Sequence, residues 1–437
     1  MIDDPITTGL LGLTAMFMLI LCQVPVGIAM GVVGVIGTGL IIGFGPALTL
    51  LATEPSGAMA AEGLAVIAMF LLMGNLAHVG GLSGELYRLA YVYLGHKRGG
   101  LIFATIGACA GFGAICGSSV ATAATMARIA LPEMLSRGYA KPLAAGSIAA
   151  GGTLGMIVPP SVVMILYAIL TENSIIALFL AAVIPGLMAV VFYFLAIAIA
   201  VKRNPDVAPL GEKADWGERR RVTMQSWAVV LLAFVVSGGI YSGVFTVSEA
   251  ASVGATVALL LAIFRKRLTR PKFLAALGDT ASNTGLIFVI IIGASVFSYF
   301  ATLSGLPAAT VDWIESRNLP HLMVIACLMI FYLILGSIFD TIAAMVLTLP
   351  FVYPLVIGMG YDPIWWGVIN IVVIELGMIT PPIGINVYVL HGMAKDLPLR
   401  TIFRGVIPFV FADLARLIVL ILFPVLSLWL PGILGWL

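Results

Sequence analysis

The sequence predicts an all-α polytopic membrane protein made of two inverted repeats, each with a re-entrant helical hairpin and a broken helix. Three observations support this prediction: the composition, the placement of basic residues, and a motif that occurs twice. Of the 437 residues, 61% are hydrophobic and only 10% are charged, which excludes an ordinary soluble domain. Lipid is therefore the expected solvent, and residues 1–437 are expected to form a single membrane domain.

The first half begins with an apolar segment, residues 6–24, that is long enough to cross a bilayer. Inverted repeat one is expected over about 60–201. Its apolar hairpin, residues 99–136, has basic residues at both ends, so the positive-inside rule places both ends in the cytoplasm and makes the hairpin re-entrant. A broken helix at 142–171 then leads outward, and the helix 175–201 returns to the cytoplasm.

Two basic loops determine the expected orientation of the chain. Residues 202–221 carry six Lys or Arg, and residues 265–272 carry five. Basic loops of multi-pass proteins lie on the cytoplasmic side, so both loops are expected there. The central helix pair 226–264 between them therefore turns on the outer side.

Inverted repeat two is expected over about 273–430. Counting crossings onward from the second basic loop, its hairpin at 320–358 opens outward, which is the reverse of the first hairpin. The broken helix at 363–394 then returns to the cytoplasm. The two hairpins thus face opposite sides of the membrane.

Self-similarity of the sequence supports this duplication. Leu154–Pro160 (LGMIVPP) reappears as Leu376–Pro382 (LGMITPP), and a Gly-Tyr pair precedes the first proline of each motif by 21 residues. Further upstream, Gly117 and Gly336 each precede a threonine by five residues, which pairs these two glycines in the repeat. Inverted repeats of this kind are expected of alternating-access carriers.

The Pro-Pro steps indicate the chemistry of the repeat. Two consecutive prolines remove two backbone donors and break the helix, which releases carbonyl groups inside the membrane. Such groups are costly in hydrocarbon unless they line a cavity or bind something, and Na⁺ prefers several hard oxygens. Nearby hydroxyls add to the supply of oxygen: Ser118, Ser119, Thr122, Thr341 and Thr380. The alternative is that both motifs only kink their helices.

Intramembrane polar residues are the candidates for substrate contact. Asp340 lies in an apolar stretch at the second hairpin tip, where it either contacts substrate or cation, or caps a helix. Arg128 suits a carboxylate substrate, although snorkelling or pairing with Glu133 is the alternative. Asn386, four residues past the second Pro-Pro step, points to the same cavity, and Glu375 is expected to be paired structurally.

Other function classes fit the sequence poorly. The four histidines are scattered, and no HExxH, serine or paired-aspartate constellation indicates an enzyme. A channel also uses carbonyls, but two broken helices and two opposed hairpins suit a carrier better. No nucleic-acid partner and no organic cofactor is expected.

Several ordered motifs carry a family resemblance that covers nearly the whole chain. They are Val24–Gly27, Gly80–Ser83, Gly117–Thr122, Leu154–Pro160, Phe245–Ala250, Leu335–Thr341 and Gly377–Gly384. In these motifs the chain resembles the large membrane (M) subunit of tripartite ATP-independent periplasmic (TRAP) transporters.

The resemblance implies an elevator-type, sodium-coupled secondary importer of organic acids, that is, of carboxylates, in the bacterial inner (cytoplasmic) membrane. It also implies two partners, a small four-helix membrane subunit and a periplasmic substrate-binding protein. A stand-alone sodium-coupled carboxylate carrier, which uses no binding protein, is the alternative. The identity of the acid is not expected to be visible in this chain, because selectivity rests largely with the binding protein.

The resemblance further implies two sodium sites, carried over position by position. Site one consists of Gly113, Cys116, Gly155, Val158 and Pro160. Site two consists of Gly336, Gly377, Thr380 and Ile383. The family usually has Ser where this chain has Cys116: if the ion contact there is a backbone carbonyl, the change has no effect, and if it is a hydroxyl, that ligand is missing.

Overall fold

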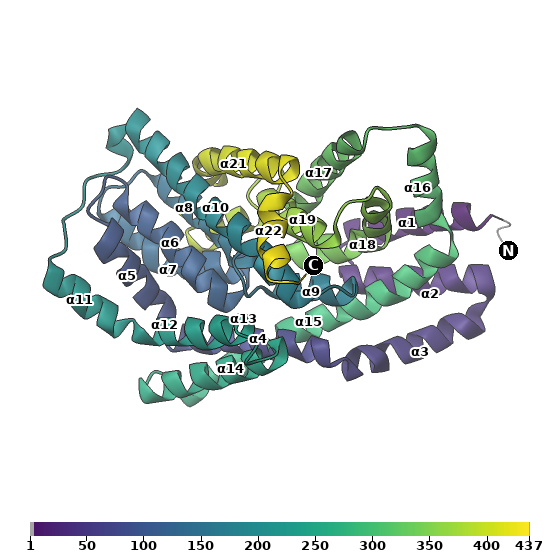
Figure 1. The fold of residues 1–437 in the computed structure, drawn as a ribbon, viewed down its shortest axis with the longest axis horizontal. Helices are drawn as coiled ribbons and strands as arrows, with labels where there is room; N and C mark the ends of the chain where they lie inside the picture. Colours follow the sequence, from purple (N-terminus) through teal and green to yellow (C-terminus); the bar gives the residue numbers. More distant parts are fainter. Residues whose placement is uncertain (1–3, 437) are drawn as a thin grey trace.

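The computed structural model describes residues 4–436, and every regular element in that part of the chain is a helix (Figure 1). Six of these helices are long and apolar enough to cross a membrane, and up to nine spans result if each bent pair counts as one. The predicted class, an all-α polytopic membrane protein, is confirmed. The helices form two groups, which we call the frame and the core.

The frame contains the helices that begin each half of the chain. Its members are α1 (Pro5–Leu21), α2 (Val26–Ile42), α3 (Phe44–Ala60), α4 (Glu62–Val79), α12 (Trp227–Ala233), the π-helical η2 (Phe234–Gly238), α13 (Gly239–Tyr241), α14 (Val247–Phe264) and α15 (Arg270–Leu303). Small residues let α2 and α15 touch through their backbones: a Cβ on Gly27 would stand 2.7 Å from Ile290 Cα. Close backbone approach of this kind is how membrane helices pack without a hydrophobic driving force.

The first half of the core follows the arm helix α5 (Leu82–Leu94). It contains α6 (Gly100–Cys116), α7 (Ser119–Ser136), α8 (Lys141–Ile157), α9 (Val162–Leu170) and α10 (Ile175–Arg203). α6 and α7 form a helical hairpin, which turns at Gly117 with a φ of 63° and is capped by Ser118, whose side chain accepts from Ala121 N. α8 and α9 are bent by 42° at the first Pro-Pro step.

The long basic loop after α10 contains η1 (Pro205–Val207) and α11 (Trp216–Gln225). The second half of the core follows the frame helix α15. It contains α16 (Leu306–Ser316), α17 (His321–Ile338), α18 (Thr341–Gly358), α19 (Pro363–Gly377), α20 (Ile385–Met393), α21 (Leu399–Leu422) and α22 (Val425–Ile433). α16 and α22 were not expected from the sequence, and α15 starts at Arg270, three residues before the expected start of inverted repeat two. Short or partly polar helices escape a search for apolar spans.

A constant spacing of 222 residues relates the two halves. Adding 222 to the bounds of α7, 119–136, gives 341–358, which are the bounds of α18. The same shift brings α1 onto α12 to α13, α2 onto α14, α5 onto α16 and α8 onto α19, within two residues at each end. The duplication therefore includes the frame and the arm as well as the hairpins and broken helices from which the sequence predicted it.

The structure corrects the predicted correspondence at the hairpin tips. The sequence paired Gly117 with Gly336, but the residue at the N-terminus of the second hairpin helix is Ser118 in one repeat and Asp340 in the other. Gly117 forms the turn, whereas Gly336 lies inside α17. The two glycines have different structural roles. Gly117 provides a left-handed turn, whereas Gly336 allows a close contact between helices.

The basic segments meet at one end of the molecule, at the left in Figure 1. Ala140 N donates to Val207 O at 2.9 Å, which joins the turn after the first hairpin to the long basic loop. Arg265 pairs with Glu85 at 2.6 Å, which joins the second basic loop to the arm helix. This clustering agrees with the prediction that all of these loops share the cytoplasmic side.

Candidate functional site

The residues of predicted sodium site one lie where the first hairpin tip packs on the first helix break. A Cβ on Gly113 would stand 2.9 Å from Gly155 N, and one on Gly155 would stand 2.8 Å from both Ser118 O and Thr122 Oγ1. Only glycine allows this approach, because real Cβ atoms do not come so close. The hairpin tip and the break are thus held in direct backbone contact.

Released carbonyls are present at this junction. α8 ends with Val158 in an extended conformation, and the prolines that follow have no N–H with which to bond the carbonyls of Gly155 and Met156. A Cβ on Gly117 would stand 3.6 Å from Pro160 O, so the turn of the hairpin lies beside the break. Cys116, one residue earlier, is buried. The atoms available as ligands here are mainly backbone carbonyl oxygens, which suit a hard monovalent cation.

The residues of predicted site two form a similar junction. A Cβ on Gly336 would overlap Ile374 O and stand 2.9 Å from Ile374 Cα, and one on Gly377 would stand 2.6 Å from Gly336 C. The loop after α19 contacts the second hairpin directly, because Gly384 N donates to Ser337 O at 2.9 Å. Thus α17 and α19 touch backbone to backbone, as α6 and α8 do in the first repeat.

Three other predicted residues lie at this second junction. Thr380 Oγ1 donates to Leu376 O at 2.6 Å, which leaves its oxygen lone pairs free to accept or coordinate. Thr341 is fully buried, and its hydroxyl contacts Met378 Sδ at 3.0 Å. Ile383 is exposed, and because its side chain is a hydrocarbon, only its carbonyl suits a ligand role.

Asn386 joins the two repeats. Its Nδ2 donates to Ser119 Oγ at 2.7 Å and to Ala149 O at 3.2 Å, so α20 is bonded to the tip of the first hairpin and to α8. Asn386 Oδ1 and Thr122 Oγ1 are buried and form no hydrogen bond with the described residues. Two uncommitted polar atoms in the centre of a membrane protein mark a candidate binding site.

We expect Asn386→Ala to lower the melting temperature of the purified protein. The substitution leaves Ser119 and the Ala149 carbonyl without their donor, which costs about 1 to 3 kcal/mol. Asn204→Ala is the matched control, because Asn204 is exposed and its side chain forms no hydrogen bond with described residues. Thermal unfolding in detergent measures the difference, and equal melting temperatures of the two variants would contradict the bridging role.

The two charged candidates, Arg128 and Asp340, are not part of these hydrogen-bonded clusters. Arg128 is exposed on α7, and the pairing with Glu133 considered from the sequence is wrong, because Glu133 pairs with Arg137 at 2.9 Å. Asp340 stands at the N-terminus of α18, but its side chain makes no capping hydrogen bond. Its carboxylate lies near the backbone N–H groups of Ile342 and Ala343, so the helix-capping alternative stands beside a contact role.

Sequence reasoning missed a buried ionic cluster. Arg416 pairs with Asp413 at 2.9 Å, both side chains are 1% exposed, and Tyr193 donates to the other Asp413 oxygen. Thr153 lies 3.0 Å from the Tyr193 hydroxyl. Glu375 is also buried, without a hydrogen-bond partner among described residues, so the pairing expected for it is absent. The signal was available: Asp413 and Arg416 are charged residues three apart in an apolar segment.

These features define a multi-span membrane transport protein with two helical hairpins packed on two broken helices. The family model for the "Tripartite ATP-independent periplasmic transporter, DctM component" matches residues 13–426. The chain therefore belongs to this family and is a large permease of the TRAP transporters, as the motifs predicted. The relatives in this family are named as transporter permeases.

Relatives agree with the assignment, and a solved structure shares the fold. The C4-dicarboxylate TRAP transporter large permease protein of Pseudomonas aeruginosa is 35% identical over 378 residues, which cover 85% of this chain and 87% of that protein. The sialic acid TRAP transporter large permease protein of Vibrio cholerae is 30% identical, with 84% and 86% covered. The crystal structure of the Alcanivorax borkumensis YdaH transporter shares the fold, with a TM-score of 0.60 at 15% identity over 88% of this chain and 89% of that one.

Proposed function

We propose that this chain is a sodium-coupled permease that imports organic acids by secondary active transport. Two Na⁺ ions are proposed to bind at the two junctions of hairpin and broken helix. Site one uses oxygens at Gly113, Cys116, Gly155, Val158 and Pro160. Site two uses oxygens at Gly336, Gly377, Thr380 and Ile383.

The observation that supports this proposal best is the repeated glycine contact between hairpin and break. Gly113 with Gly155 and Gly336 with Gly377 bring the hairpins against the helix breaks. At the first break the prolines deprive the Gly155 and Met156 carbonyls of their helical donors, whereas at the second break Gly377 O accepts from Thr380 N at 2.8 Å. Carbonyl groups without a hydrogen-bond donor inside a membrane need a cation or water as a partner. Broken helices in transporters coordinate Na⁺ with such carbonyls. If the Pro-Pro motifs only kinked their helices, the hairpins would not need to contact both helix breaks.

The substrate is proposed to be a carboxylate held between the two sodium sites. The relatives named above are named for C4-dicarboxylate and for sialic acid, and both kinds of molecule carry a carboxylate. The uncommitted atoms Thr122 Oγ1 and Asn386 Oδ1 lie beside Ser118 and Ser119, and Thr341 stands at the opposite tip. Arg128 and Asp340 remain proposed contacts, since neither has an ion-pair partner among described residues.

An elevator motion is proposed for the transport step. Every residue of the two sodium sites belongs to the core, and none comes from the frame. A core that carries both ions and the substrate can therefore move against the frame without dismantling a site. The basic loops are proposed to face the cytoplasm, with the chain in the bacterial inner membrane.

Two partners are proposed from family membership: a small four-helix membrane subunit and a periplasmic substrate-binding protein. Reconstitution into proteoliposomes tests both the partners and the coupling. We expect saturable, sodium-dependent uptake only when all three components are present. Uptake by this chain alone would instead support a stand-alone carrier, and uptake unchanged by replacing Na⁺ with K⁺ would overturn the coupling.

We expect Thr380→Val to raise the sodium concentration required for half-maximal uptake. Valine keeps the shape of the side chain but removes the hydroxyl oxygen, and loss of one such contact costs about 1 kcal/mol, roughly fivefold in affinity. Thr380→Ser keeps the hydroxyl and serves as the control. If the valine and serine variants need the same sodium concentration, the hydroxyl is not a ligand.

A further inference from the structure

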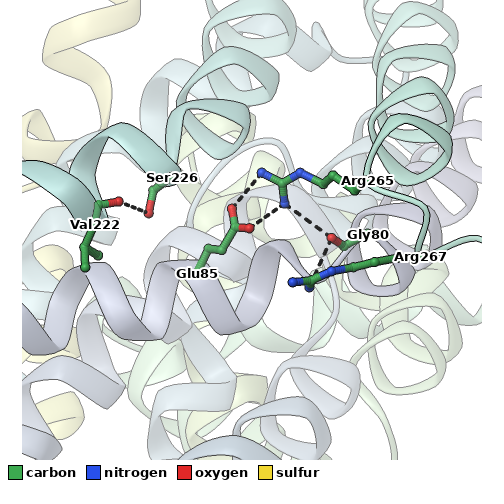
Figure 2. A network of polar contacts seen from close by, with 6 residues as sticks. All are labelled: Gly80, Glu85, Val222, Ser226, Arg265 and Arg267. Carbon is green, nitrogen blue, oxygen red and sulfur yellow. Dashed lines mark hydrogen bonds and ion pairs between the residues drawn. The ribbon is translucent and has the colours of Figure 1, made fainter.

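A cavity of 670 Å³ opens at the basic end of the molecule, away from both proposed sodium sites. It lies between the arm helix α5, the junction of α11 with α12, and the turn that joins α14 to α15. The residues that line it include Glu85, Arg88, Ser226, Trp227, Arg265 and Arg267. Figure 2 shows Arg265 and Arg267 reaching from that turn toward Gly80 and Glu85 at the start of the arm.

The cavity contains more positive charge than its own residues neutralise. Arg265 makes two bonds to the Glu85 carboxylate, at 2.6 and 2.9 Å, and a third to Gly80 O at 3.3 Å. Arg267 reaches only Gly80 O, at 3.5 Å, and Arg88 is exposed and forms no ion pair with the described residues. Two guanidinium groups therefore face the cavity without a counter-charge, which suits an anion with several oxygens.

An apolar stripe begins at the rim of the same cavity. Trp227 lines the cavity and is 54% exposed, and Val230 and Phe234 continue along the same helix face at 59% and 74% exposure. Their spacing of three and four residues places them in one row. A tryptophan between a basic pocket and an exposed apolar row is the pattern found at the membrane interface, where headgroups meet acyl chains.

We propose that this cavity binds the phosphate headgroup of an anionic phospholipid. Arg88 and Arg267 contact the phosphate, and the acyl chains lie along Trp227, Val230 and Phe234. Because Arg88 lies on the arm and Arg267 on the turn between frame helices, the bound lipid fastens the arm to the frame. A free phosphate ion offers the same oxygens but nothing for the apolar stripe.

Native mass spectrometry of the delipidated full chain in detergent tests the proposal, with added phosphatidylglycerol or phosphatidylcholine as the probe. We expect phosphatidylglycerol to bind preferentially. The double variant Arg88→Gln/Arg267→Gln is expected to bind it roughly thirtyfold more weakly, because each surface cation contributes roughly fivefold to binding of anionic lipid. Its melting temperature without lipid is expected to match that of the unmodified protein, because neither side chain has an ion-pair partner to lose.

The matched control is Lys266→Gln/Arg220→Gln, which removes two exposed cations close to the cavity that do not line it. This control is expected to keep its affinity for phosphatidylglycerol. Equal losses in the two double variants would overturn the proposal, since they would show attraction by general surface charge. Thermal stabilisation by inorganic phosphate that equals the effect of phosphatidylglycerol would also overturn it, because the site would then belong to a free anion.

Discussion

Gly336→Ala is expected to raise the sodium concentration for half-maximal uptake by roughly tenfold or more. The added Cβ would overlap Ile374 O and stand 2.9 Å from Ile374 Cα, and backbone atoms of a buried helix cannot move aside individually. α17 and α19 must therefore separate, which pulls the proposed ligands at Gly336, Gly377 and Thr380 apart. Uptake into proteoliposomes at varied sodium concentration measures the effect.

Gly278→Ala is the control for this prediction. Gly278 lies inside helix α15, and a Cβ added there meets no atom within 4 Å. Alanine is the better helix former, so this variant is expected to be at least as stable as the parent and to keep its sodium dependence. A Gly336→Ala protein with unchanged sodium dependence would show that the contact between α17 and α19 does not shape an ion site.

The fold class could be predicted because its causes are visible in single residues and short motifs. Hydrophobic composition requires lipid, basic loops orient the crossings, and a Pro-Pro step must break a helix wherever it occurs. The residues carried over to the two sodium sites also come together in space, in two separate junctions. These residues were assigned from the family resemblance, and the backbone contacts of Gly113 with Gly155 and of Gly336 with Gly377 are what the structure adds.

The register of the hairpins could not be predicted, because it depends on where a helix starts. Gly117 and Gly336 share a spacing to a threonine, yet one forms a turn and the other packs inside a helix. The local sequence does not distinguish a glycine that provides a left-handed conformation from one that admits a neighbouring backbone. Only the bounds of α7 and α18 resolved the difference.

Partners of polar and charged side chains could be predicted within one helix but not between the two repeats. Glu133 stands five residues from Arg128 and four from Arg137, and the helix surface brings only the second pair together. Asn386 contacts Ser119 from a segment 267 residues away, a pairing that depends on how the two repeats dock. Contacts within one helix follow from spacing, whereas contacts between repeats do not.

Arg416→Met is expected to reduce stability strongly, by about 3 to 5 kcal/mol. Arg416 and Asp413 are both 1% exposed, and Glu375 is buried with them without another partner, so the guanidinium is the only cation paired in this cluster of described residues. Methionine fills much of the same volume but leaves the buried Asp413 carboxylate without a compensating charge. The melting temperature in detergent should fall on the order of 10 °C.

Two further variants separate charge from packing in this cluster. Arg404→Met, on the same helix but at an exposed position, is expected to change the melting temperature little. The double variant Arg416→Met/Asp413→Asn should recover a large part of the loss, because an amide keeps the Tyr193 hydrogen bond without a buried charge. If instead the two substitutions are additive, then the cost arises from packing, and the ion pair does not stabilise the contact of α21 with α10.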